Sequence, residues 1–435
     1  SASRTASTPG GSSVKCEETA TGLLTARIMS TVRPGDPVRR LGRLSMSAPL
    51  TVAILAGGLT HEREVSLHSG RRVAAALREA GMYVKIFDVD ANLLQRLHSM
   101  APDIVWPLIH GSTGEDGSLQ DLLELAGHPY VGTDPASCKL ASDKAIAAAV
   151  LAREGVAMPD SVTIPQKLFR EVGVAPILDL IKARFGFPLV VKPSQGGSAL
   201  GVTIVEESAA LPGAMVDCYA YGEDARIEKY IDGREVAVAV MERATESSSA
   251  EPPSTVPSSS AMSSALAESL SPTASPSPAA PSPSTAATSA PSPSAASDPA
   301  ATYEQASFCR APTSRTGEPH ALPPVEIVTD GPYDFDARYN AGRSEYFVPA
   351  RLTDEETSTV KSTAERVHRI LGLRHLSRTD IVLDGDGVPW VLDVNVAPGM
   401  TETSLFPQAA AAEAHNLGTT VDDLYTKILR SAIDR

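Results

Sequence analysis

The sequence predicts an α/β (α+β) fold with more than one domain. Three observations predict this fold class. A short apolar strand at 51–56 is followed by glycines and an amphipathic helix, as at the start of an α/β unit. A hairpin with a glycine-rich loop is predicted at 187–206. A second hairpin, within 377–405, carries acidic and amide side chains. The 435 residues could form two or three domains.

Composition excludes several classes of protein. The net charge of -14 argues against a nucleic-acid-binding protein, because phosphate contacts need clustered Lys and Arg. No apolar run approaches the roughly 18 to 20 residues needed to span a bilayer, so no membrane partner is expected. The four cysteines lack CxxC spacing, which indicates neither a zinc site nor a disulfide framework. Reduced thiols favour a cytoplasmic protein.

Two segments are set aside from the predicted fold. Residues 1–48 are rich in Ser, Thr, Gly and Arg, and we expect a disordered N-terminal extension. Residues 243–322 are dominated by Ser, Ala, Pro and Thr, and we expect a disordered insertion. Such compositions bury too little apolar surface to offset the entropy of ordering. We expect the insertion to be dispensable.

The first α/β unit is predicted to contain strands at 51–56, 83–89 and 103–108. Ligands bind at the carboxyl ends of such strands, where Glu62 and His110 follow the first and third strands. The glycines do not form GxGxxG, which weakens a dinucleotide-binding interpretation. Glu62 could instead be a charge that favours the start of a helix, and His110 could be structural.

A helical run at 133–155 is expected to carry Lys144 near its start, and the glycine-rich hairpin follows it. The loop QGGSALG is predicted to be a flap whose backbone amides can approach an anion. Ser198 adds a hydroxyl, and Lys192 stands where it can reach phosphate oxygens. This is not a Walker loop, because GK[ST] and a following helix are missing. An ordinary glycine-rich hairpin is the alternative.

Residues 226–240 are predicted to form two strands joined by a turn at Asp232 and Gly233. Glu228 and Glu235 lie near the ends of these strands. They could hold a purine ring and its ribose hydroxyls. A solvated hairpin is the alternative.

The loop after the insertion is rich in Tyr, Asp and Arg. Arg338 and Tyr339 could bind a ligand or stand at the rim of a site. A helix is predicted over TDEETSTVKSTAERVHRILG, with a capping box formed by Thr353 and Glu356 and with His368 on the surface.

The hairpin near the C-terminus is predicted to bind a divalent cation. Its DGDG turn sets the expected register, with 383 opposite 388, 380 opposite 391, and 378 opposite 393. Side chains alternate with a period of two, so one face carries Arg378, Asp380, Asp393 and Asn395. Carboxylate and amide oxygens suit Mg²⁺ or Mn²⁺. A solvated hairpin with an Arg378–Asp393 ion pair is the alternative.

Taken together, eight motifs in order resemble the D-alanine:D-alanine ligases of the ATP-grasp superfamily. The motifs are HEREVSLHSG, HGSTGEDGSLQ, the SDK around Lys144, VVKPSQGGSALG, IEKYIDGRE, YDFDARY, SRTD and DVNVAPGMTETSL. They span roughly residues 50–430 apart from the insertion. The resemblance implies an ATP-grasp architecture with a Rossmann-like domain at 49–142, a small central domain at 143–236 and a catalytic domain at 237–435.

The implied reaction joins two D-alanines for peptidoglycan synthesis. ATP phosphorylates the carboxylate of one D-alanine, and the amine of the second attacks the acyl phosphate. The implied ligands are ATP, D-alanine and two Mg²⁺ (or Mn²⁺) ions. The resemblance also favours a homodimer.

The resemblance assigns residues to each ligand. The nucleotide phosphates would contact Lys144 and Lys192. The adenine would contact Glu228, Lys229 and Ile231, and the ribose would contact Glu235. The metal ions would be bound by Asp380, Asp393 and Asn395. The first substrate would meet Glu62 and His110, and the carboxylate of the second would meet Arg338, Gly399 and Ser404. Ser198, Tyr339 and Glu62 would join in a closed lid, and Arg378 would stabilise the oxyanion.

The sequence departs from the usual family pattern at three positions. Asp393 stands where the family usually has Glu, Arg338 replaces a common Lys, and Ala397 replaces a common Ser. The shorter Asp393 motivates one rival hypothesis, a catalytically silent nucleotide-binding relative. The other rival is a ligase that joins D-alanine to a hydroxy acid. Tyr339 favours the dipeptide over this ester.

Overall fold

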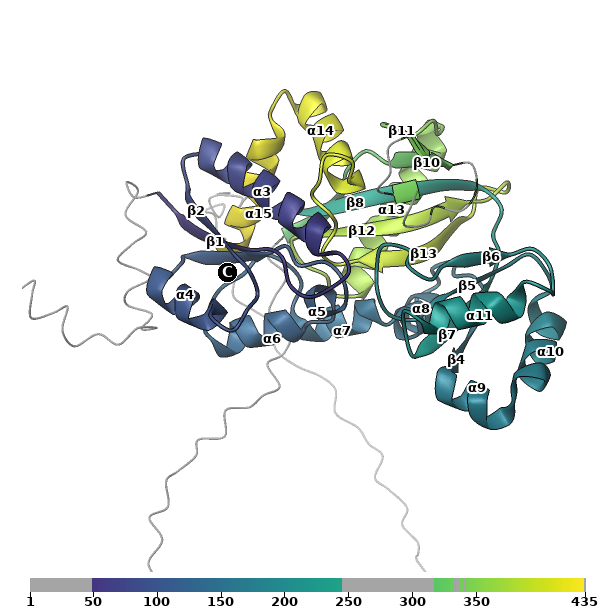
Figure 1. Ribbon diagram of the computed structural model, residues 1–435. Helices are drawn as coiled ribbons and strands as arrows, with labels where there is room; N and C mark the ends of the chain where they lie inside the picture. The colour runs from purple at the N-terminus through teal and green to yellow at the C-terminus, as the bar shows by residue number, and fades with distance from the viewer. Residues whose placement is uncertain are drawn as a thin grey trace, which may run out of the picture. The chain divides into compact units, whose positions relative to one another are not determined.

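The computed structural model describes residues 49–244, 317–329, 331, 333, 337–338 and 342–433. The extension predicted at 1–48, most of the predicted insertion (245–316) and Tyr339 lie outside these residues. The described chain contains three β-sheets (Figure 1). Within it, no helix is both long and apolar enough to cross a membrane.

The first sheet is parallel, with the order β2-β1-β3. Its elements are β1 (Thr51–Leu55), α3 (Arg63–Glu79), β2 (Tyr83–Phe87), α4 (Leu93–Met100), β3 (Ile104–Pro107), α5 (Ser112–Glu115) and α6 (Ser118–Leu125). β1 is apolar from Val52 to Leu55 because both faces are buried there, with Val52 and Ile54 in one core and Ala53 and Leu55 in another. The predicted α/β unit is confirmed, and its loops leave from the carboxyl ends of β1 and β3.

The second sheet is antiparallel, with the order β4-β7-β5-β6. Helices α7 (Pro135–Ser142) and α8 (Lys144–Arg153) precede it. Its own elements are β4 (Ser161–Pro165), α9 (Gln166–Val172), α10 (Val174–Phe185), β5 (Leu189–Pro193), β6 (Thr203–Val205), α11 (Leu211–Tyr219) and β7 (Asp224–Lys229). The helical run expected at 133–155 is therefore two helices. They are divided at Asp143, whose side chain accepts from the first amides of α8. The hairpin β5–β6 is confirmed, and we call residues 194–202 between its strands the flap.

The third sheet follows the order β11-β10-β8-β12-β13, and β9 also pairs with β8. Its elements are β8 (Arg234–Ala244), β9 (Gly317–Ala321), β10 (Val325–Thr329), β11 (Ser344–Phe347), α13 (Asp354–Ile370), β12 (Leu376–Leu383), β13 (Pro389–Asn395), α14 (Leu405–Leu417) and α15 (Val421–Ile433). Alternate residues of β8 enter two cores, Val236 and Val238 on the side of α13 and Ala237 and Ala239 on the side of α14 and α15. This sheet therefore has helices on both faces.

Helix α13 confirms the predicted capping box between Thr353 and Glu356. The expected surface position of His368 is wrong. Its side chain is fully buried, and its Nδ1 lies 2.8 Å from the hydroxyl oxygen of Ser377. A histidine on the inner face of an amphipathic helix is tolerated there because a polar partner is available.

The two strands predicted within 226–240 are present, but they belong to different sheets. β7 pairs with β4 and β5, whereas β8 pairs with β10 and β12. The turn between them passes close to the third sheet, so that a Cβ atom at Gly233 would lie 2.3 Å from the carbonyl oxygen of Leu383. Glycine permits this approach, and the chain changes sheets there.

Both ends of the predicted 243–322 insertion were placed wrongly. β8 continues to Ala244, and β9 begins at Gly317, directly opposite Ala244 in the antiparallel register. Leu322 is fully buried in the core beside α14 and α15. These residues are ordered because backbone pairing and one buried leucine compensate for the polar composition around them.

The register expected for the β12–β13 hairpin is also wrong. Leu383 lies opposite Pro389 and not opposite 388, so the pairing is already offset by one residue at the turn. A bulge between Asp380 and Ile381 adds one more, so that Asp380 lies opposite Asp393 and Arg378 opposite Asn395. The combined offset of two residues leaves these four side chains on one face of the sheet. The prediction of a shared face is confirmed.

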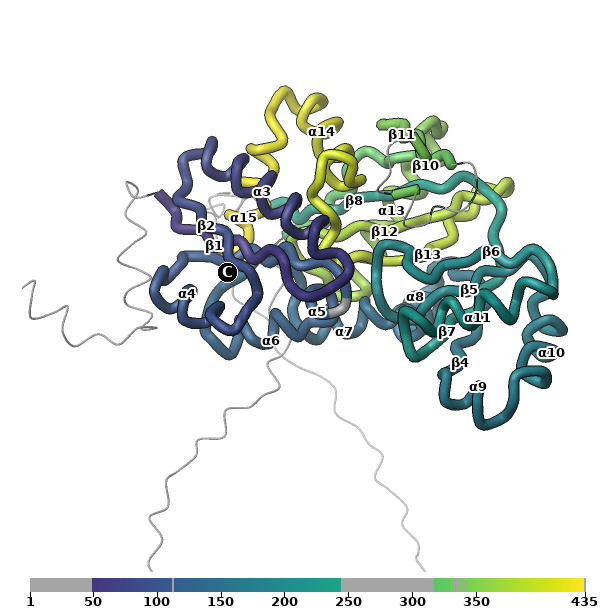
Figure 2. The backbone as a smooth tube through the Cα atoms, in the orientation of Figure 1, coloured from purple at the N-terminus to yellow at the C-terminus, as the bar shows by residue number. Residues whose placement is uncertain are grey.

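The last helix packs beside the first sheet. Figure 2 shows the yellow α15 next to the purple α3. The rings of Trp106 from β3 and Tyr425 from α15 meet edge to face, with centroids 6.2 Å apart. The C-terminal segment thus supports the elements that carry Glu62 and His110.

Candidate functional site

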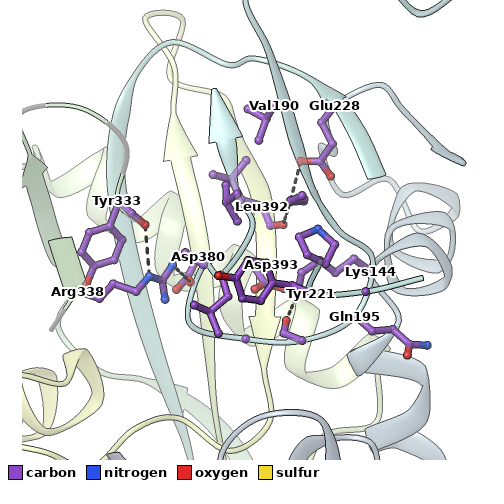
Figure 3. A pocket seen from close by; sticks show the side chains of 18 of the residues that line it. Lys144, Val190, Gln195, Tyr221, Glu228, Tyr333, Arg338, Asp380, Leu392 and Asp393 are labelled. Atoms are coloured by element: carbon purple, nitrogen blue, oxygen red, sulfur yellow. Dashed lines mark hydrogen bonds and ion pairs between the residues drawn. The ribbon is translucent and has the colours of Figure 1, made fainter. Parts of the chain in front are cut away.

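A cavity of about 880 Å³ lies among the loops of the first sheet, the flap and the strands of the other two sheets. Figure 3 shows part of its lining. The predicted site residues that line it are Glu62, Lys144, Lys192, Glu228, Lys229, Ile231, Glu235, Arg338, Asp380 and Asp393. A second cavity, of about 50 Å³, shares Lys144, Arg338 and Asp393 with the first and adds Ser198, Arg378 and Asn395. His110, Gly399 and Ser404 line neither cavity.

The acidic side chains of the β12–β13 hairpin are balanced by cations. The guanidinium of Arg378 donates two hydrogen bonds to Asp380, of 2.7 and 2.8 Å. The ammonium of Lys144 donates to Asp393 at 2.8 Å. Burial alone would raise the pKa of Asp393, but Lys144 and Lys192 hold it below its usual value. Asp393 is therefore ionised, and both aspartates line the cavity.

This donor set fits Mg²⁺ of the kind that shares its coordination shell with phosphates. Mg²⁺ commonly takes one or two protein carboxylates and completes its shell with water and phosphate oxygens. Asp380 and Asp393 offer two carboxylates on paired strands, and the side-chain oxygen of Asn395 accepts from the amide of Ala397 at 2.8 Å. No cluster of three Asp, Glu, His or Cys side chains suited to a metal is found among the described residues.

The flap closes one side of the cavity through Lys144 and Ser198. The ammonium of Lys144 also donates to the carbonyl oxygen of Gly196, at 3.1 Å. The hydroxyl of Ser198 donates to Glu62. Ser198 and Ala199 have φ angles of 50° and 55°, in the left-handed region that few residues other than glycine adopt. Strain at these two residues fits a flap held in place by its partners.

Two carboxyl groups from the first sheet meet beside the flap. A Cβ atom at Gly197 would lie 3.4 Å from an oxygen of Glu62 and 3.5 Å from one of Glu115. Burial raises the pKa of Glu62 to about 7, against the opposing charges of Arg338, Arg378 and Lys144. Burial, reinforced by the nearby charge of Glu62, raises the pKa of Glu115 to about 8. This pair would gain from a positively charged ligand.

The opposite side of the cavity carries the residues predicted to hold the nucleoside. Lys229 and Ile231 line it between β7 and β8. The carboxylate of Glu228 lies 2.5 Å from Nε of Arg226 and 2.6 Å from the ammonium of Lys192. Burial raises the pKa of Glu235 to about 7, and Asp380 contributes to this rise while Arg338 opposes it.

Arg338 lies against an aromatic ring at the edge of the cavity. Its guanidinium is 4.5 Å from the ring centroid of Tyr333 and 4.0 Å from Asp380. Its Nε donates to the carbonyl oxygen of Tyr333 at 3.4 Å. Figure 3 shows Arg338 between Tyr333 and Asp380. The predicted partner Tyr339 lies outside the described residues, so its position relative to Ser198 and Glu62 stays a prediction.

His110 connects the first sheet to the loop that follows β13. Its Nδ1 lies 3.0 Å from the carbonyl oxygen of Ala397, which can only accept, so this nitrogen donates. Nε2 is then the acceptor for the hydroxyl of Ser69, 3.0 Å away. Burial lowers the pKa of His110 to about 4, and the imidazole is neutral at neutral pH. The amide of Met400 also donates to Ser69, at 3.0 Å.

Gly399 and Ser404 lie together in the loop before α14. A Cβ atom at Gly399 would lie 2.7 Å from the hydroxyl oxygen of Ser404. That oxygen accepts from the amide of Thr401 at 3.1 Å. The loop is thus closed on itself by Ser404 and fixed to the first sheet through His110 and Ser69.

Two residues at or behind the site received no role from the sequence. Glu115 follows His110 in the same loop, and only the closeness of that loop to Glu62 shows its importance. Arg226 precedes Glu228 by two positions, so the period of a strand already places both on one face. This period of two indicates Arg226 from the sequence alone. No local pattern indicates Glu115.

The chain matches known families over most of its length. Residues 91–133 match the model described as D-ala D-ala ligase N-terminus. Residues 150–262 and 312–430 match the model described as D-ala D-ala ligase C-terminus. A D-alanine–D-alanine ligase of Anaeromyxobacter dehalogenans is 32% identical over 382 residues, covering 88% of this chain and 96% of the relative. One from Pelotomaculum thermopropionicum is 29% identical over 386 residues, covering 88% and 97%.

Solved structures share the fold. The D-alanine–D-alanine ligase of Bacillus anthracis complexed with ATP is 21% identical, with a TM-score of 0.59, covering 88% of this chain and 98% of that one. The VanG D-Ala:D-Ser ligase of Enterococcus faecalis is 21% identical, with a TM-score of 0.60, covering 88% and 100%. The ATP-grasp architecture implied by the sequence motifs is confirmed.

Proposed function

The chain belongs to the D-alanine–D-alanine ligase family, and from this premise we propose that it joins two D-alanines, with ATP as the energy source, to form D-alanyl-D-alanine for peptidoglycan. One observation carries the proposal. Asp380 and Asp393 lie opposite each other and line the same cavity as Lys144 and Lys192. Paired carboxylates beside two lysines suit a triphosphate that brings divalent cations.

The nucleotide would lie along the cavity from the second sheet to the third. Its adenine would meet Glu228, Lys229 and Ile231, and Glu235 would accept from the ribose hydroxyls. Lys144 and Lys192 would contact the phosphates. Support for this placement comes from the cavity, because all of these residues line it. We propose domain boundaries at 142/143 and 236/237, so that each domain contains one of the three sheets. The chain passes from the second sheet to the third at Gly233, just before the second boundary.

Asp380, Asp393 and Asn395 would hold two Mg²⁺ or Mn²⁺ ions. When bound, these ions would neutralise charge on the phosphates. Asp393 is shorter than the usual Glu of the family. Its carboxylate nevertheless reaches the cavity, since it meets Lys144 there. This observation argues against a catalytically silent relative.

The first D-alanine would place its ammonium near Glu62 and Glu115, which form no ion pair with the side chains that the structure describes. A positive ligand would lower the pKa of both carboxyls and be stabilised in return. His110 would stand near the carboxylate of this substrate. It is neutral and held by two hydrogen bonds, so it would orient the surrounding loop without adding charge.

The second D-alanine would meet the loop before α14 and the guanidinium of Arg338. Arg338, Gly399 and Ser404 would receive its carboxylate, and its amine would attack the acyl phosphate formed on the first. Arg378 would donate to the oxyanion that develops. Two of its N–H groups are fixed by Asp380, which sets the direction of the remaining donors.

Ser198, Glu62 and Tyr339 would hold the flap closed and keep water away from the acyl phosphate. The contact between Ser198 and Glu62 supports this part of the proposal. Once closed, the flap would also keep Lys144 against the phosphates through Gly196.

The test measures phosphate release from ATP by the full chain, with and without D-alanine. We expect release that depends on D-alanine, with D-alanyl-D-alanine as the product by mass spectrometry. Parallel reactions that add D-lactate or D-serine to D-alanine measure the rival second substrates. Release without any dependence on D-alanine, or a depsipeptide as the main product, would overturn the proposal.

Homodimerisation and a cytoplasmic location stay predictions of this proposal. Sedimentation of the purified chain measures the first, because a dimer of a 45.5 kDa chain has a mass of about 91 kDa. Fractionation of the source cells measures the second.

A further inference from the structure

Arg226 is buried behind the cavity and has no role in the site described so far. Its side chain is 4% exposed and does not line either cavity. Its Nε donates to Glu228 at 2.5 Å, and its Nη2 has no hydrogen-bond partner among the described residues. The polar contact of this guanidinium is therefore directed at one carboxylate, which itself lines the cavity.

The same carboxylate has a second cation. Lys192 lies directly opposite Arg226 in the β5–β7 pairing, and its ammonium is 2.6 Å from Glu228. Like charges opposite each other on neighbouring strands repel. One carboxylate between two cations leaves this buried group with a net charge of +1. For folding alone, either cation would suffice to pair Glu228.

The extra positive charge would be balanced if an anion bound beside these three side chains. Lys192 is the member at the cavity, and in the proposed function it contacts nucleotide phosphate. A phosphate there competes for this ammonium with Glu228, a side chain that is only 4% exposed, and with the carbonyl oxygen of Leu392, to which Lys192 donates at 3.0 Å. A buried carboxylate that loses its only cation carries a large desolvation penalty. With Arg226 in place, Glu228 keeps a partner.

We propose that Arg226 is a positioning residue that holds the carboxylate of Glu228 while Lys192 transfers from it to a nucleotide phosphate. Arg226 thereby lowers the free energy of the nucleotide-bound state more than that of the ligand-free state. This inference rests on the proposed function, since it takes a nucleoside triphosphate as the anion. It assigns to Arg226 an effect on nucleotide affinity without contact with the nucleotide.

The test measures binding of a non-hydrolysable ATP analogue with Mg²⁺ to the full chain by calorimetry. In Arg226→Met, we expect the dissociation constant to rise at least about tenfold, because loss of one partner of a buried charge is costly in the bound state. The melting temperature without ligand should change by less than about 3 °C, since Lys192 still pairs Glu228. Arg226→Gln gives the same test with a hydrogen-bond donor retained, should the Met variant fail to fold.

Two further variants isolate the charge. Arg226→Lys keeps a cation and should bind the analogue within about threefold of the wild type. Arg184→Met is the matched control, because Arg184 forms an ion pair with Asp160 on the same unit with both side chains more than half exposed. It should bind the analogue as the wild type does.

The outcomes separate this inference from the proposed function. If the wild type does not bind the analogue, the proposed function fails. If the wild type binds and the Met and Gln variants bind equally well, the role of Arg226 is refuted while the function stands. A fall in melting temperature with unchanged affinity would show a purely structural ion pair, and a Lys variant as weak as Met would refute the role of charge.

Discussion

The two acidic pairs at the site differ in how their charge is balanced. Asp380 and Asp393 on β12–β13 each meet a cation directly, and the pKa of Asp393 lies below its usual value. Glu62, which is buried, and Glu115, at the end of α5, lie beside each other and have no such partner among the residues that the structure describes. Their pKa values rise to about 7 and about 8. The first pair already has its own cations, and the second would gain from a positively charged ligand.

The difference indicates two kinds of ligand. A carboxylate pair that already lies beside cations is suited to metal ions that arrive with phosphate. A pair whose pKa values are raised to about 7 and about 8 is suited to an ammonium group, which would displace a proton. In the proposed function, the nucleotide would lie at the first pair and the amino acid at the second.

The largest effect is expected for Asp380→Asn. The substitution keeps the shape and one acceptor for Arg378 but removes the charge. We expect D-alanine-dependent phosphate release to fall about a thousandfold, because metal stabilisation of transferring phosphate is worth several kcal/mol. Circular dichroism should show an intact fold, and calorimetry should show that Mg²⁺ no longer strengthens binding of the ATP analogue. Turnover near that of the wild type would remove Asp380 from the metal site.

Glu62→Gln should act on the amino acid and spare the nucleotide. Loss of a charged hydrogen bond of about 1.5 to 3 kcal/mol should lower kcat/KM for D-alanine about 10- to 100-fold. KM for ATP should stay within about twofold. The control is Glu64→Gln, two positions away and exposed on α3. Equal losses for both substrates would contradict the division between the two acidic pairs.

The raised pKa of Glu115 predicts how stability depends on pH. Its folded-state pKa is about 8 against an ordinary 4.5, so over this range the folded chain holds a proton that the unfolded chain has released. Stability must therefore fall as pH rises. Glu62 and Glu235 act in the same direction up to about pH 7. His110, whose pKa is lowered to about 4, acts in the opposite direction below about pH 6.5.

Between pH 6.5 and 8, the pH dependence of stability reports on these glutamates. Without ligand, the free energy of unfolding of the wild type should fall over this interval, as measured by urea denaturation. Glu115→Gln should flatten the fall. Parallel pH profiles for the two proteins would show that Glu115 ionises normally and that the two acidic pairs do not differ as described.

The smallest effect is expected for a change far from both acidic pairs. Ala244 and Gly317 lie opposite each other at the end of β8 and β9, so an Asn-Gly turn can replace residues 245–316. We expect kcat and both KM values to stay within about twofold, because neither acidic pair contacts this end of the sheet. A loss of more than about tenfold would show that 245–316 contributes to catalysis.

Local patterns in the sequence predicted the elements of the fold and many of the residues of the site. The period of two in β12 and β13 placed Asp380 and Asp393 on one face even though the expected register was wrong. The bulge at Asp380 has no signature in composition, because it depends on how the hairpin fits against β8 and its neighbours. The capping box of α13 was visible because its residues are three positions apart.

Contacts between distant segments needed the tertiary structure. Lys144 meets Asp393 across 249 positions, and Ser198 meets Glu62 across 136. Likewise, Glu115 became part of the site only because two loops of the first sheet converge on Gly197. The sequence by itself determined periodicity, caps and turns, which depend on residues a few positions apart. The tertiary structure decided which charges are paired and which pKa values shift, because burial and pairing depend on packing between segments far apart in the chain.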